Sequence, residues 1–186
     1  MPRPPSRSGA VSKGSIVQRS PVFAHTLVLT VLVAACSAHG TEDRESAKLV
    51  EALKGASVSL EAGLSVSEPL GSPISGEFEI ADGMLELTVY VAKGTELLDV
   101  TVDPKTGVVA SVEPIADSKE VRLAKGYRDA MLKAKVSLRA ATEQAVKANP
   151  GYRAVSIVPG LKDGHPVAEV VLLKGEEFKE ISVALE

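Results

Sequence analysis

The sequence predicts an α+β protein of two similar units, each a helix packed on a small antiparallel β-sheet, joined by a helical linker. Two observations predict this class: short segments recur in the second half of the 186-residue chain, and helical and strand periodicities follow in the same order in both halves. The segments that recur are 56–62 as 134–140, at an offset of 78, and 82–83 as 163–164 and 93–102 as 174–183, both at 81. Three landmarks in the same order indicate a duplication.

The second half contains a clear helix followed by strands. Ser137 is a suitable N-cap, apolar residues then recur at helical spacing from Leu138, and Asn149-Pro150-Gly151 ends the helix. Asp163-Gly164 and Lys174-Gly175 predict hairpin turns. The expected strands are 153–158, 166–173 and 177–185.

The first half follows the same plan. A weaker helix is expected from Leu60 to about Glu68, because Gly63 and several serines lower its propensity. Apolar and polar residues alternate through 84–91 and 97–102. This period of two places one face of the sheet on a core and the other in water.

A further helix is expected before each unit. Asp117 and Glu120 have capping-box spacing, and apolar residues recur at helical spacing after them, so 117–135 is expected to be the linker helix. Its counterpart before the first unit is 45–55.

The first 35 residues have the composition of a secretory signal. They contain four basic residues and no acidic one, and an apolar run from Leu27 to Ala35 is too short to span a bilayer. The true start could lie downstream of Met1, because the charged region is long and rich in proline. We expect residues 1–35 to be removed and 36–44 to form a tether.

The end of this run, Val33-Ala34-Ala35-Cys36, resembles the lipobox of bacterial lipoproteins. The resemblance implies that Cys36, the only cysteine, carries the lipid and becomes the mature N-terminus. It implies an exported protein anchored to the cell envelope, and the absence of Asp after Cys36 favours the outer membrane, on its periplasmic side, in a Gram-negative cell. A non-lipidated signal cut near Ala35 is the alternative.

The charge of the mature chain excludes one class of partner. The full chain has 21 basic and 24 acidic residues, and removing the four basic residues of 1–35 leaves 17 against 24, a net charge of −7. Nucleic-acid binding needs clustered Lys and Arg, so no nucleic-acid partner is expected.

The motifs of the two halves resemble the PepSY domain. In the first half they are 58–62, Asp82-Gly83, 98–102 and the turn Asp103-Pro104-Lys105-Thr106-Gly107. The second half has 136–140, Asp163-Gly164 and 181–183, and it stops before a counterpart of that last turn and strand. The resemblance gives a first unit over 45–116, with its leading helix, and a truncated second unit over 136–186. It implies a non-enzymatic envelope protein that could restrain a peptidase.

The residues point to no catalytic or metal chemistry. Downstream of the signal the histidines are His39, expected in the tether, and His165, expected to be exposed at the start of a strand. They offer neither a metal site of the usual spacing nor a serine-histidine-carboxylate triad, and no phosphate-binding glycine motif occurs. We therefore expect no enzyme activity and no cofactor.

Two binding functions are therefore favoured over an enzymatic one. The first is binding of another envelope protein, through an edge strand of the second unit that includes Glu177, Lys179, Ile181 and Val183. The second is a small-molecule or ion-binding module that uses acidic surface. Charge on 177–180 could equally protect this edge from pairing.

Overall fold

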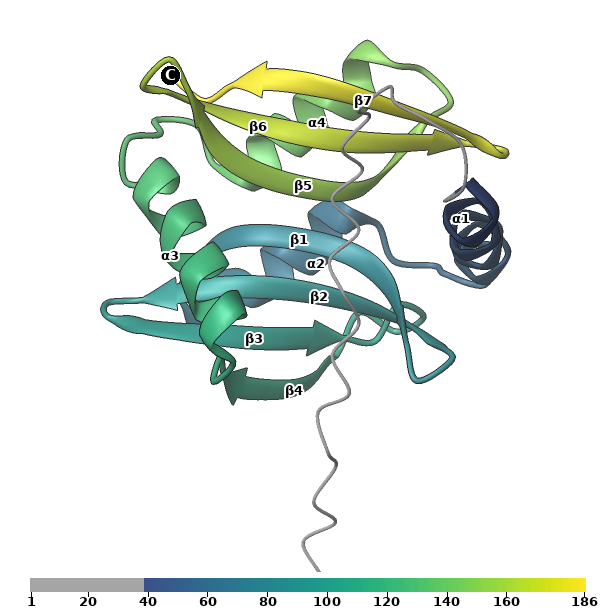
Figure 1. Cartoon of the computed structure of the whole chain (residues 1–186), viewed down its shortest axis with the longest axis horizontal. Helices are drawn as coiled ribbons and strands as arrows, with labels where there is room; N and C mark the ends of the chain where they lie inside the picture. The colour runs from purple at the N-terminus through teal and green to yellow at the C-terminus, as the bar shows by residue number, and fades with distance from the viewer. Residues whose placement is uncertain (1–38) are drawn as a thin grey trace, which may run out of the picture.

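A computed structural model of the chain describes residues 39–186, with side chains from Arg44 onward. It combines four α-helices with one antiparallel sheet in these residues, so the predicted α+β class is confirmed (Figure 1). The elements are α1 His39–Leu53, α2 Leu60–Ser67, the 3-10 turn η1 Glu68–Leu70, β1 Ser72–Ala81, β2 Met84–Lys93, β3 Glu96–Val102, β4 Val109–Pro114, α3 Ser118–Met131, α4 Leu138–Ala148, β5 Arg153–Lys162, β6 His165–Lys174 and β7 Glu177–Ala184.

The strands form a single seven-stranded sheet in the order β4-β3-β2-β1-β5-β6-β7. The expectation of two separate small sheets is therefore corrected. The two halves join where β1 pairs with β5, with Gly76 opposite Ile157 and Glu77 opposite Ser156. Each of these strands would otherwise be an edge with unpaired backbone groups, and pairing them removes two edges at once.

The strands of the two halves keep the same spacing in the chain. β5, β6 and β7 begin 81 residues after β1, β2 and β3. The bulge between Pro73 and Ser75 recurs between Ala154 and Ser156. Both Asp-Gly hairpins have positive φ at both turn positions, with φ of 51° at Asp82 and 54° at Asp163, which is the geometry that favours this dipeptide.

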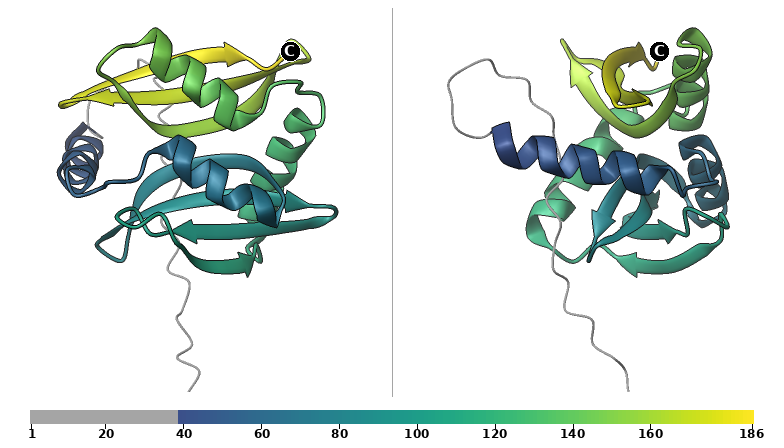
Figure 2. Two further views of the ribbon diagram at one scale, coloured as in Figure 1. Left: turned by 180° about the vertical axis from the view of Figure 1, so that it is seen from behind. Right: turned by 90° about the vertical axis from the view of Figure 1, so that its right-hand side faces the viewer.

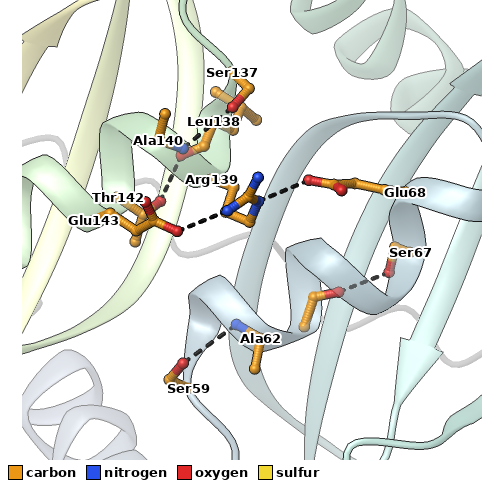
Figure 3. A network of polar contacts seen from close by, with 11 residues as sticks. Ser59, Ala62, Ser67, Glu68, Ser137, Leu138, Arg139, Ala140, Thr142 and Glu143 are labelled. Atoms are coloured by element: carbon orange, nitrogen blue, oxygen red, sulfur yellow. Dashed lines mark hydrogen bonds and ion pairs between the residues drawn. The ribbon is translucent and has the colours of Figure 1, made fainter.

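Helices α2 and α4 lie side by side on one face of the sheet (Figure 2). Each is capped by a serine whose Oγ accepts from a backbone N–H, Ser59 from Ala62 and Ser137 from Ala140, each over 3.2 Å (Figure 3). The predicted N-cap of α4 is thus confirmed. Arg139 of α4 joins the halves by donating from Nε to Glu68 over 2.9 Å, an exposed pair that contributes little stability.

Both halves share one hydrophobic core beneath these two helices. Leu60 and Leu64 of α2 belong to the same buried cluster as Leu138 of α4 and Ile157 of β5. Gly63 lets α2 approach the sheet closely, because a Cβ there would lie 2.2 Å from a methyl carbon of Leu87. The shared core and sheet make the two halves one packed body.

The linker helix does more than connect the halves. The structure places it at Ser118–Met131, where Asp117 caps it by accepting from Lys119 and Glu120 N–H groups. It crosses the face of the sheet opposite α2 and α4, against β1, β3 and β5 (Figures 1 and 2).

Helix α1 lies at the other end of the sheet from α3 and contacts β1 and β2 (Figure 1). It begins at His39, within the range expected to be a tether, so the leading helix starts earlier than the predicted 45. His39 accordingly lies at the start of a helix. The apolar residues near the C-terminal end of α1, Val50 and Leu53, are buried in the main core, which explains why this helix forms.

Candidate functional site: a free strand edge and an acidic sheet face

Strand β7 lies at one edge of the sheet, as the functional prediction requires. Of the four residues that the sequence singled out there, Glu177 and Lys179 are exposed, Ile181 is half-buried and Val183 is buried. The two apolar side chains belong to the core beneath α4. The four residues therefore share one side of the strand, the side that packs on the helix layer.

The backbone groups at the free edge belong to the alternate residues. The Leu185 N–H donates to the Pro166 carbonyl of β6 over 3.0 Å, in line with the β6–β7 register. In an antiparallel ladder, backbone groups of successive residues point to opposite edges. The N–H groups of Lys179, Ile181 and Val183 therefore face β6, and those of Phe178, Glu180, Ser182 and Ala184 face away from the sheet.

The side-chain pattern of 177–185 does not single out these outward residues, because their free groups belong to the backbone. Strand alternation shows only that the backbone groups of successive residues point to opposite edges of the strand. Which set faces the neighbouring strand depends on the pairing register, and no feature of 177–185 alone determines it.

Strand β3 is the counterpart of β7 and has this same edge occupied. Strand β4 pairs with it, and the Ile115 N–H donates to the Leu97 carbonyl over 2.9 Å just beyond the end of β4. Leu97 lies 81 residues before Phe178. The position beside β7 that corresponds to β4 holds no strand of residues 39–186.

The opposite edge of the sheet is β4, and it is less suited to pairing. Because the Ile115 N–H faces β3, the outward groups of β4 on the C-terminal side of its bulge belong to Val112 and Pro114. Pro114 has no N–H to donate, which is a common way to protect an edge. β7 has no proline in its eight residues.

The charged side chains of β7 differ in how they are held. Glu177 accepts a hydrogen bond from the Tyr152 hydroxyl, and Lys179 Nζ donates to Asn149 Oδ1 over 2.7 Å. Lys179 also lies 5.8 Å from the Tyr152 ring centre. Glu180 is exposed and has no hydrogen-bond or ion-pair partner among the described residues.

An acidic patch lies on the sheet face that α3 partly covers. Its members, Glu77, Glu79 and Asp99, come from β1 and β3, and the Thr88 hydroxyl donates to Glu79 over 2.7 Å. Asp99 Oδ1 is buried without a hydrogen-bond partner in the described residues. The period of two in the sequence predicted that this face lies in water, whereas the linker helix α3 packs against it.

Burial and mutual repulsion make these carboxylates weak acids. Burial, together with the charges of Glu79 and Asp99, raises the pKa of Glu77 to about 7. Burial is the largest cause that raises the pKa of Asp99 to about 7, and the negative charges of Glu79 and Glu120 add to it. Burial also raises the pKa of the Tyr90 hydroxyl. The face is thus partly protonated near neutral pH.

The remaining residues that the sequence singled out form no metal site among the described residues. His165 is exposed at the start of β6, as expected, and its Nδ1 lies 2.6 Å from Glu186 Oε1. Within residues 44–186, no group of three or more His, Cys, Asp or Glu side chains is placed to hold a metal ion. No helix among the described elements is both long and apolar enough to span a bilayer. Cys36 and the signal residues lie outside the described range.

Comparisons of the chain with protein-family models, curated proteins and solved structures gave no match.

Proposed function

We propose that this chain is a non-enzymatic, lipid-anchored protein of the bacterial cell envelope that binds another envelope protein through the free edge of β7. The observation that carries the proposal is the row of outward backbone groups on Phe178, Glu180, Ser182 and Ala184. An extended segment of a partner can add to such an edge by main-chain hydrogen bonding, without any constellation of side chains.

The anchor is proposed from the sequence. The leader ends in Val33-Ala34-Ala35-Cys36, and Cys36 is the only thiol available for lipid attachment. Helix α1 begins at His39, only three positions after Cys36. A lipid on Cys36 would therefore hold the folded part within a short distance of the membrane surface, where envelope proteins are its neighbours.

The family assignment is also part of the proposal. The repeated V-S-L helix starts, the paired Asp-Gly hairpins and the Asp103-to-Gly107 turn support two PepSY-like units. In this turn Asp103 Oδ1 accepts from the Thr106 N–H over 2.7 Å, so the motif has a structural role in reversing the chain before β4. The resemblance suggests restraint of a peptidase as the consequence of partner binding.

The second candidate is binding of a small molecule or ion, favoured by the buried, unpartnered Asp99 Oδ1 in the acidic patch. Dialysis of the purified protein followed by elemental analysis tests it. A stoichiometric ion that is lost in Asp99→Asn would favour this candidate over protein binding.

Capture of partners from native envelopes tests the main proposal. Lipidated wild-type protein should retain a specific envelope protein, and Ser182→Pro should lose it, because proline removes an outward donor of β7. Ser182→Ala keeps that donor and should retain the partner. Val112→Pro removes an outward donor from the opposite edge and should also retain it. Equal capture by all four proteins would contradict the proposal.

A further inference from the structure

We infer that β7 accepts a single antiparallel strand whose aliphatic residues lie opposite Ile181 and Val183 and whose basic residue lies opposite Glu180. The inference rests on the proposed function, since it specifies the segment by which a partner protein would dock on β7. Its template is within the chain, in the pairing of β3 with β4.

The backbone geometry of β3 defines the orientation of the added strand. β4 runs antiparallel to β3, with Val100 opposite Val112 and Thr101 opposite Ser111. The residues 81 positions later on β7 are Ile181 and Ser182. A strand laid on β7 in this register meets the outward groups of Glu180 and Ser182, as β4 meets those of Asp99 and Thr101.

The side chains on the helix side of the sheet call for aliphatic partners. On β3 the core residues Val100 and Val102 are fully buried, and their neighbours on β4 are Val112 and Val109. On β7 the corresponding Ile181 is only half-buried, and Val183 keeps 8% of its surface exposed. An aliphatic residue opposite each would bury apolar surface that the sheet leaves accessible.

The other side of the strand calls for a basic residue. On β3 this position pairs Asp99 with Glu113, two like charges directly opposite each other. On β7 the corresponding Glu180 has no partner in the described residues, whereas Glu177 and Lys179 are held by Tyr152 and Asn149. Opposite charges in a cross-strand pair are favourable and like charges are unfavourable, so Lys or Arg fits this position better than Glu does.

A peptide copied from β4 is the direct probe. The probe is Val-Val-Ala-Ser-Val-Lys-Pro-Ile, which is residues 108–115 with Glu113→Lys. Binding to the whole mature chain is measured by fluorescence anisotropy of the labelled peptide. We expect saturable binding, weakened about tenfold by Ser182→Pro through loss of a main-chain bond and a clash with the added strand, and changed less than about twofold by Ser182→Ala.

Charge reversal gives a second arm that does not depend on proline being tolerated. Glu180→Lys should weaken the Lys peptide about two- to fivefold and strengthen by a similar factor the parent peptide that keeps Glu113. Thermal unfolding followed by circular dichroism checks that each variant is folded.

The two proposals fail in distinguishable ways. No binding of the Lys peptide at millimolar concentration, or equal binding by wild type, Ser182→Pro and Glu180→Lys, overturns the strand pattern. If envelope capture is nevertheless lost in Ser182→Pro, the proposed function stands and the pattern alone is wrong. If envelope capture is also unchanged in Ser182→Pro, the β7 edge is not the site, and both the proposed function and the strand pattern are wrong.

Discussion

Asp99 and Glu113 lie directly opposite each other across β3 and β4, on the sheet face that α3 partly covers. Glu113 is one of several carboxylates that raise the pKa of Asp99, after burial, Glu79 and Glu120. In the second half the corresponding residue is Glu180, whose place opposite is open among residues 39–186. Residues 39–186 thus supply a strand beside β3 and none at the corresponding position beside β7.

The acidic patch should make the protein less stable as the pH rises. The pKa of Glu77 is raised from 4.5 to about 7, so the folded state binds more protons than the unfolded state between these values. The stability that protonated Glu77 contributes is fully present below about pH 4.5. It falls as the pH rises through about 7, and above that pH this contribution is lost. We expect a loss on the order of 1–3 kcal/mol between pH 4.5 and pH 8, measured by urea unfolding.

Glu77→Gln should flatten this dependence and stabilise the protein at pH 8, because it removes one of the repelling charges. The exposed Glu96 on β3 gives a matched control, and Glu96→Gln should keep the wild-type profile. A Glu77→Gln profile that falls as steeply as wild type would show that the patch is not responsible.

Gly63→Ala should destabilise the protein although alanine favours helices. The added Cβ meets the fully buried Leu87 side chain at 2.2 Å, so the core must shift. We expect a net loss of about 1–2 kcal/mol, as overpacking outweighs a gain of up to about 1 kcal/mol in helix propensity. Gly126 of α3 is the control, because nothing lies within 4 Å of its Cβ position. Gly126→Ala should be stabilising by about 0.5–1 kcal/mol.

Cys36→Ser should abolish lipid attachment. Wild-type protein made in a host that processes lipoproteins should take up a fatty-acid label and remain with the membrane fraction. The variant should do neither, since the chain has no other cysteine. Absence of label on the wild type would leave the non-lipidated signal, cut near Ala35, as the correct interpretation.

Adding a copy of the β4 segment after Glu186 should cover the outer edge of β7. The variant has Ala184→Asp and a copy of 106–115 joined after Glu186, which reproduces the turn that leads into β4. Because an attached strand has a high effective concentration, we expect a higher melting temperature and no binding of the Lys peptide. The same extension with its valines replaced by aspartate should change neither property.

The repeat in the sequence predicted much of the fold. Offsets of 78 and 81 residues, read from short matches, predicted the helix starts at Leu60 and Leu138 and the Asp-Gly hairpins, and the strand bounds keep the offset of 81. These features depend on local chemistry: a serine cap, a positive φ at Asp-Gly, and a period of two. Local signals of this kind survive in a single sequence.

The joining of the two sheets could not be predicted in the same way. It depends on two residue pairs, Gly76 with Ile157 and Glu77 with Ser156, which lie far apart in the chain. The position of α3 over the acidic patch also depends on contacts between residues far apart in the chain. Its fully buried Ala124 could pack on either face of the sheet as far as the sequence alone indicates. Partner choice between distant elements is decided by packing, which a periodicity does not encode.

The most direct test of the central claim is residue-resolved amide hydrogen exchange along β7, with and without the Lys peptide. In the free protein, Lys179, Ile181 and Val183 should exchange slowly and Phe178, Glu180 and Ser182 fast, because only the first set faces β6. Saturating peptide should slow the outward set at least tenfold. Outward amides that are already slow in the free protein, or that stay fast when peptide is bound, would contradict the claim that β7 is the docking edge.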